Sequence, residues 1–182
     1  MHLGISLDGY FEGPDADISW HRVDDELHSY MNEQLVTASA FLEGRVTYEL
    51  MEDFWPTADQ GPDVEPPVAE FAQVWRDMPK VVYSRTLDAP GPNATLVRDV
   101  VPEEVRALQA QPGGDMIVGG PVLAESFRRH DLIDEYKIFV HPVLVGGGRR
   151  LFESEGPPAD LRLVETHTFG NGVVMLRYEV ER

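Results

Sequence analysis

Short apolar runs alternate along most of the chain with stretches in which apolar residues recur at helical spacing. Runs of four to five residues that are typical of strands occupy 2–6, 40–43, 80–84, 94–97, 115–118 and 136–140. Helical spacing occupies 24–36, 45–54, 68–75, 102–108 and 121–129, with Gly113-Gly114 expected to close the fourth of these helices. Residues 57–67 are rich in Pro, Gly and Asp and indicate an irregular connection.

The last part of the chain follows a different pattern. Residues 161–168 and 173–180 alternate between apolar and polar with period two, and Gly170-Asn171-Gly172 separates them, which predicts a β-hairpin. Strand–helix alternation followed by a hairpin predicts a three-layer α/β/α fold with a mixed, mostly parallel central sheet and a C-terminal antiparallel hairpin. No repeat or linker divides the chain, so we expect a single domain over residues 1–182.

Two of the strand-to-helix connections turn on glycine. One runs through Gly119 and Gly120 into a helix that opens on Pro121, where the missing N–H of proline has no partner to lose. The other turns at Gly44, and Arg45 and Thr47 follow it directly. Free amides at a helix N-terminus bind anions, and glycine lets a phosphate approach the backbone. Together the two turns favour a ligand with several phosphates, such as a dinucleotide; the alternative is two tight connections without a ligand.

Two further segments carry candidate chemistry. The loop at 7–20 contains the aromatic residues Tyr10, Phe11 and Trp20 and could cover a ligand. Asp8 in that loop, and Asp25 and Glu26 in the first turn of the next helix, are the candidate proton donors for catalysis. The alternative roles are a turn aspartate for Asp8 and favourable helix-dipole electrostatics for the other two.

A glycine loop near the C-terminal third of the chain is a third candidate. Gly146, Gly147 and Gly148 precede Arg149 and Arg150, so a backbone nest beside two cations could hold a substrate phosphate. The alternative is a turn with solvated arginines.

The composition excludes several classes of partner and of site. The formal net charge of −17 argues against nucleic acid and anionic membrane surfaces as partners, and it requires local cations wherever an anion binds. The absence of cysteine excludes disulfides, thiolate zinc sites and a cysteine nucleophile, and is compatible with the cytoplasm. No H-E-x-x-H occurs among the six histidines, so no metal site is expected. No apolar run has the length of a membrane span, and no signal peptide is evident.

Five motifs follow one another along the chain: Ser6-Leu7-Asp8-Gly9, Gly44-Arg45-Val46-Thr47-Tyr48-Glu49, Val82-Tyr83-Ser84-Arg85, Val118-Gly119-Gly120-Pro121, and Pro142-Val143-Leu144-Val145-Gly146-Gly147-Gly148 with Leu151-Phe152. Taken in this order, they resemble the dihydrofolate reductase superfamily, and more narrowly the reductase domain at the C-terminus of the bifunctional riboflavin-pathway deaminase-reductases. The resemblance implies NADPH as cofactor. It implies that phosphates are held by Gly44, Arg45 and Thr47, the adenosine end by Ser84 and Arg85, and the pyrophosphate by Gly119, Gly120, Pro121 and Val122.

By the same resemblance, the chain would transfer hydride to a small heterocyclic or carbonyl substrate, with a riboflavin-biosynthesis-type activity and a homodimeric assembly. No zinc deaminase is expected within this sequence, because the metal site of that partner uses cysteines and the sequence has none. Asp24, Asp25 and Glu26 align poorly with the single buried carboxylate of folate reductases. The alternatives are a non-catalytic nucleotide-binding or scaffold protein that retains the fold, and a pterin or dihydrofolate reductase.

Overall fold

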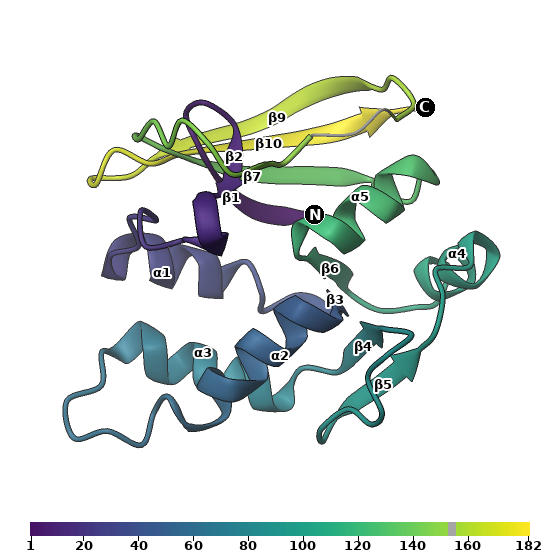
Figure 1. The fold of residues 1–182 in the computed structure, drawn as a ribbon, viewed down its shortest axis with the longest axis horizontal. Coiled ribbons are helices and arrows are strands. Elements are labelled where there is room, and N and C mark those ends of the chain that lie inside the picture. The colour runs from purple at the N-terminus through teal and green to yellow at the C-terminus, as the bar shows by residue number, and fades with distance from the viewer. Residues whose placement is uncertain (153–155) are drawn as a thin grey trace. The chain divides into compact units, whose positions relative to one another are not determined.

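The computed structural model describes residues 1–152 and 156–182. The described chain divides into two compact units, one formed by 24–123 and the other by 1–23 together with 124–182. Figure 1 shows helices and strands in both units. A single domain over 1–182 stays a prediction, and each unit is considered by itself.

The unit of residues 24–123 is built on an all-parallel sheet with strand order β5-β4-β3-β6. Its strands are β3 (Ala38–Gly44), β4 (Lys80–Tyr83), β5 (Ala94–Val97) and β6 (Asp115–Gly119). Its helices are α1 (Asp25–Glu33), α2 (Arg45–Phe54), the short 3₁₀ helix η2 (Trp55–Thr57), α3 (Pro66–Asp77) and α4 (Pro102–Gln109), and α5 (Pro121–Arg129) begins in it. Because all four strands are parallel, the segments that follow them leave from one edge of the sheet.

A cluster of aromatic and aliphatic side chains forms the core of this unit around Trp75, which is 1% exposed. The indole stacks on Phe41 with 5.6 Å between ring centroids and donates its N–H to Glu52. Lys80 lies over the indole ring, and its ammonium donates to the carbonyls of Trp75 and Met78. These contacts of Trp75 with Phe41 and Lys80 hold α3 against the sheet.

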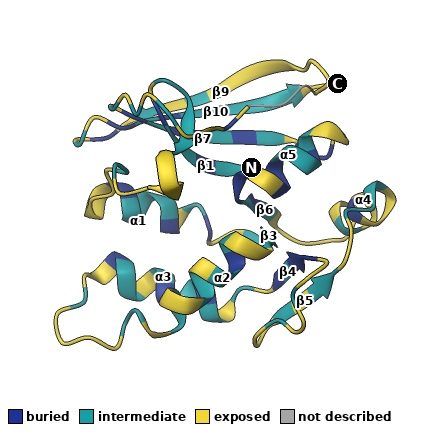
Figure 2. Ribbon diagram, in the orientation of Figure 1, coloured by how far each residue is buried: buried dark blue, intermediate teal, exposed yellow. Residues whose placement is uncertain are grey.

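The other unit carries a mixed sheet with strand order β1-β7-β10-β9. Its strands are β1 (His2–Ser6), β7 (Glu135–His141), β9 (Asp160–Thr168) and β10 (Val174–Glu181); β1 is parallel to β7, and β10 is antiparallel to both its neighbours. The predicted C-terminal hairpin is therefore confirmed, and with it the mixed α/β class. Figure 2 shows β9 as mostly exposed and β4 of the first unit as mostly buried.

Three local expectations need correction. Residues 7–20 are not an irregular loop throughout, since β2 (Tyr10–Glu12) pairs with β8 (Arg149–Arg150) and the 3₁₀ helix η1 covers Pro14–Ala16. Helix α3 begins at Pro66 and not near 68. Helix α4 ends at Gln109, before the glycines expected to close it.

A Cβ at Gly114 would overlap the Thr37 carbonyl, so glycine there permits a close backbone approach.

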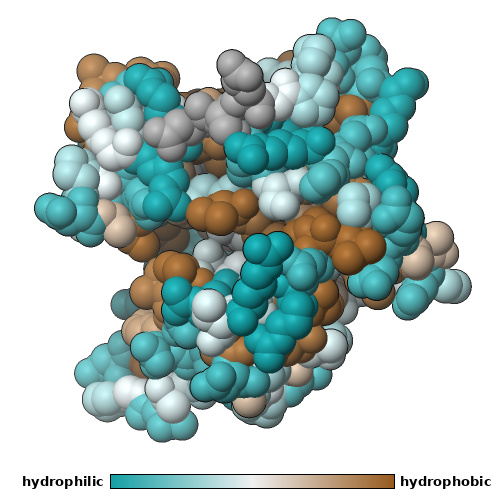
Figure 3. Space-filling view, turned by 45° about the vertical axis from the view of Figure 1, so that its right-hand side comes forward, coloured by the Kyte–Doolittle hydropathy of each residue, from teal (hydrophilic) through white to brown (hydrophobic). Residues whose placement is uncertain are grey.

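Some large apolar side chains remain in contact with solvent. Val46, Leu50 and Phe54 are spaced four residues apart on α2 and are more than half exposed. Figure 3 shows hydrophilic and apolar side chains intermixed on one face of the molecule. Among the described residues, none of the helices combines the length and the apolar character that a membrane span requires.

Candidate functional site

The two glycine turns of the sequence lie side by side in the unit of residues 24–123. Strands β3 and β6 are hydrogen-bonded neighbours, and Glu43 stands opposite Gly119 in their register. Gly120 has φ +78°, and a Cβ on it would overlap Oγ1 of Thr47. Leu123 from the first turn of α5 lies 3.7 Å from where a Cβ of Gly44 would stand. The starts of α2 and α5 therefore belong to one site.

The start of α2 leaves its amides available to an anion. Gly44 is the N-cap in an extended conformation, and no side chain caps the helix. The Arg45 guanidinium donates to Glu49 at 2.7 Å, with both side chains nearly half exposed. An exposed ion pair of this kind contributes about 0–1 kcal/mol, so Arg45 can exchange it for a phosphate at little cost. Uncapped amides, a threonine hydroxyl and an exchangeable arginine fit an anionic ligand.

A buried carboxyl that lies near the end of β3 was not predicted from the sequence. Glu43 is 4% exposed, and its Oε2 has no hydrogen-bond partner among the described residues. A Cβ on Gly119 would overlap both carboxyl oxygens, so the carboxyl lies directly over that glycine. Burial raises the pKa of Glu43 to about 8, against a smaller lowering by the charge of Lys80. The signal in the sequence was an acidic residue that ends an otherwise apolar strand.

The segment after β4 reaches the same edge of the sheet. The Ser84 hydroxyl accepts hydrogen bonds from the amides of Thr86 and Leu87, at 3.1 and 2.9 Å, so it shapes its own turn. Arg85 is mostly exposed and donates to Asp99 at 2.6 Å. Arg98, also missed from the sequence, donates to the Ser84 and Leu87 carbonyls and holds this segment. The placement of Ser84 and Arg85 beside an adenosine stays a prediction.

Two predicted cofactor residues open α5. Pro121 is buried, and Val122 is 69% exposed, directly after Gly120. Val122 is therefore accessible to a ligand at the paired turns. Contact of both residues with a pyrophosphate stays a prediction.

Asp8 lies in the unit of 1–23 and 124–182, where its carboxylate accepts from the Ser6 hydroxyl and from the amides of Val145 and Gly146, at 2.6, 3.1 and 2.8 Å. These hydrogen bonds lower the pKa of Asp8 to about 2, which stabilises the ionised carboxylate, and a catalytic role for Asp8 stays a prediction. The geometry favours the structural role of Asp8.

The glycine nest that could have held a substrate phosphate is also engaged, since its Gly146 amide binds Asp8. Arg149 pairs with Glu12, and Arg150 donates to the Asp8 carbonyl and to the Tyr10 hydroxyl. The anion that this loop binds in the structure is the protein's own carboxylate.

Asp25 and Glu26 occupy the exposed first turn of α1, where Asp24 caps the helix by accepting from the Leu27 amide at 3.0 Å. Their negative charges are favourable at this positive end of the helix dipole. A catalytic role for either residue stays a prediction. Within the parts of the chain that the structure describes, no group of three or more His, Asp or Glu side chains could hold a metal ion.

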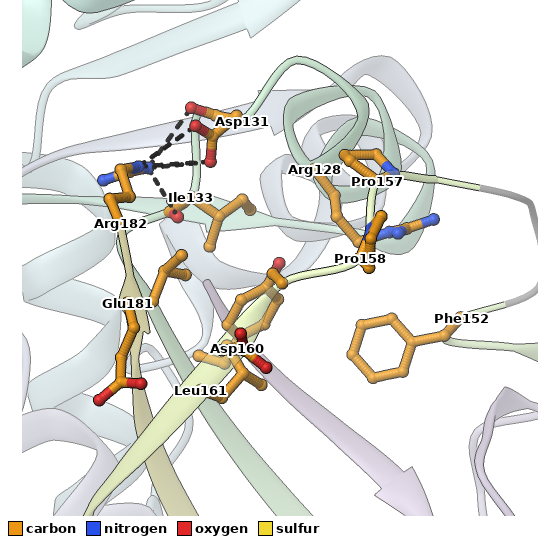
Figure 4. A pocket seen from close by; sticks show the side chains of 13 residues that line it. Arg128, Asp131, Ile133, Phe152, Pro157, Pro158, Asp160, Leu161, Glu181 and Arg182 are labelled. Atoms are coloured by element: carbon orange, nitrogen blue, oxygen red, sulfur yellow. Dashed lines mark hydrogen bonds and ion pairs between the residues drawn. The ribbon is translucent and has the colours of Figure 1, made fainter.

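A cavity of about 620 Å³ lies in the unit of 1–23 and 124–182 (Figure 4). Its cations are engaged by neighbouring acids: Arg128 donates to Glu125, and Arg182 to Asp131 and Asp134. None of the site residues predicted from the sequence lines this cavity.

The fold and the site define an α/β protein whose two glycine turns meet at the carboxyl edge of a parallel sheet. The model of the RibD C-terminal domain matches residues 1–175, and the chain belongs to that family. This confirms the resemblance found in the motifs. The protein is 31% identical to the uncharacterized protein YyaP of Bacillus subtilis over 179 residues, which cover 98% of this chain and 92% of YyaP.

Solved structures show the same fold. A Shewanella sp. PV-4 protein described as a candidate riboflavin biosynthesis protein superposes with a TM-score of 0.73 at 21% identity, over 100% of this chain and 97% of that one. A diaminohydroxyphosphoribosylaminopyrimidine deaminase/5-amino-6-(5-phosphoribosylamino)uracil reductase from Thermotoga maritima superposes with a TM-score of 0.68 at 19% identity. That match covers 99% of this chain and 55% of the longer protein.

Proposed function

We propose that this protein is a reductase that binds NADPH at the paired glycine turns and reduces a small heterocyclic or carbonyl substrate of the kind handled in riboflavin biosynthesis. Membership of the RibD C-terminal domain family supports a reductase, and the reductase named in the Thermotoga protein supports the substrate class. The main observation in favour of the cofactor is the close approach of Gly120 to Thr47, which brings the starts of two helices into one site.

In this site each group has a physical task. The uncapped amides of α2, the Thr47 hydroxyl and the Arg45 guanidinium would hold phosphate oxygens. Gly120 keeps the second turn open, because no side chain fits beside Thr47. NADPH, when bound, supplies the hydride. Because Asp25 and Glu26 are exposed and Asp8 is only partly buried, these groups do not provide the buried carboxyl on which a folate reductase relies, and the pterin alternative loses support.

The test is calorimetric titration of NADPH into the wild type, Arg45→Ala and Gly120→Ala. We expect at least tenfold weaker binding in both variants, since one loses a cation and the other closes the turn. Gly172→Ala is the matched control: Gly172 also has a positive φ, of +87°, but lies in the β9–β10 hairpin, so its substitution strains the backbone without touching the glycine turns.

Unchanged affinity in both site variants would show that the cofactor site is elsewhere. Substrate turnover is followed by the loss of reduced-nicotinamide absorbance over a panel of pyrimidines, pterins and simple carbonyls. NADPH binding without turnover of any compound would favour the non-catalytic nucleotide-binding alternative.

A further inference from the structure

The carboxyl of Glu43 has no role in the proposed site as described so far, although it lies inside it. It is the last residue of β3 before Gly44, which ends the strand, and it faces Gly119 in the register of β3 and β6. Both carboxyl oxygens lie over Gly119, where a side chain would otherwise stand. The residue therefore adjoins both turns that would bind phosphate.

The described surroundings of Glu43 leave one of its two carboxyl oxygens without a hydrogen bond. Its Oε2 is buried without a partner among the described residues. On β4, its register partner is the apolar Val82, and on β6 it is glycine. Buried polar atoms in proteins nearly always have a partner, so an orphaned carboxyl oxygen beside an open turn indicates a group that a ligand satisfies.

We propose that Glu43 binds the ligand as a neutral carboxylic acid and donates its O–H to a phosphate oxygen held at the paired turns. This inference rests on the proposed function and adds a proton-dependent contact to it. A carboxylate would repel the phosphate, whereas the acid form adds a donor without adding negative charge to a chain of net charge −17.

The charged groups around Glu43 agree with this state. Lys80, on β4, is the neighbour whose charge favours ionisation, but its ammonium is already held by the Trp75 and Met78 carbonyls. On α2, Arg45 is paired with Glu49 at the exposed side, and Thr47 is neutral. On β6 and at the start of α5, Gly119, Gly120, Pro121 and Val122 carry no charge. Burial therefore dominates and keeps the proton on Glu43 at neutral pH.

The experiment compares NADPH affinity at pH 7 and pH 9 for the wild type, Glu43→Gln and Glu43→Leu. With a pKa of about 8, the protonated fraction of Glu43 falls about tenfold over this interval, so wild-type affinity should fall about tenfold. Glu43→Gln keeps an N–H donor and cannot ionise, so its affinity should change little with pH. Glu43→Leu should bind more weakly than the wild type at pH 7, and at least as well at pH 9.

Glu103→Gln is the matched control, because it removes one exposed negative charge from α4 and should keep the wild-type pH dependence. A carboxyl ¹³C titration of Glu43 with and without NADPH gives a readout independent of affinity, and the ligand should move its titration to higher pH. If Glu43→Gln weakens with pH as the wild type does, this inference is wrong and the proposed cofactor site stands. If the wild type fails to bind NADPH at pH 7, both are wrong.

Discussion

At the scale of single residues, burial decides which ionisable groups carry charge. His141 on β7 is 2% exposed, and its Nδ1 accepts a hydrogen bond from the Arg22 amide at 3.0 Å. Its ring stacks on that of His21, with centroids 4.8 Å apart. Burial, with smaller contributions from His21 and Arg22, lowers the pKa of His141 to about 4. The folded protein therefore holds this imidazole neutral at pH values where an unfolded histidine is protonated.

The consequence is a loss of stability in mild acid. As the pH falls from about 6.5 to about 4, the unfolded chain takes up a proton at His141 and the folded chain does not, so the free energy of unfolding decreases. His141→Gln retains an acceptor for Arg22 and cannot titrate, so its urea-denaturation profile should be flatter across this window. His130→Gln, at an exposed position, should keep the wild-type slope. An unchanged slope in His141→Gln would contradict this origin of the acid sensitivity.

At the scale of elements, the sequence patterns predicted the helices and strands whose formation depends on residues close together in the chain. The alternation of 161–168 and 173–180 predicted the hairpin because each strand presents one side chain per face at every second residue. The start of α3 at Pro66 was missed because two prolines suggest a break, although proline is favourable in the first turn. The β2–β8 pair was missed because strands of three and two residues carry no periodicity.

The candidate site shows the same difference between residues close together in the chain and residues brought together by folding. The glycine turns were found from the sequence because their motifs are contiguous. Glu43 was missed because its isolation depends on Val82 and Gly119, which come from strands far apart in the chain. Likewise, the amides of residues 145 and 146 that donate to Asp8 lie far from it in the chain, so no pattern near Asp8 predicts these two hydrogen bonds, whereas the Ser6 hydroxyl that also donates to it is local.

The packing of α3 on the sheet gives a stability prediction at this scale. Trp75→Ala removes a side chain that is 1% exposed, stacks on Phe41 and donates to Glu52, so unfolding should become easier by about 3–5 kcal/mol. Leu50→Ala, at a position 59% exposed on α2, should change stability by less than about 0.5 kcal/mol. Chemical denaturation of both variants measures the difference, and similar values for the two would mean that Trp75 does not anchor the core.

At the scale of the whole molecule, the net charge of −17 opposes the approach of any polyanion. The Debye length shortens from about 30 Å at 0.01 M salt to about 8 Å at 0.15 M, so added salt screens the distant surface charges far more than a phosphate in contact with Arg45. The association rate of NADPH should therefore rise several-fold over this range, the reverse of the usual trend for anion-binding proteins.

Stopped-flow fluorescence of NADPH binding measures this rate. Glu103→Lys and Glu104→Lys on the exposed start of α4 should raise the rate at low salt and flatten its dependence on ionic strength, because they reduce the long-range repulsion without touching the paired turns. A rate that falls as salt is added would mean that the cations near the turns, Arg45 and Arg85 among them, create an attractive field that extends beyond the acidic surface. In that case the glycine turns would recruit their ligand by electrostatic steering, whereas a rising rate leaves the capture of the phosphates to hydrogen bonds formed after contact.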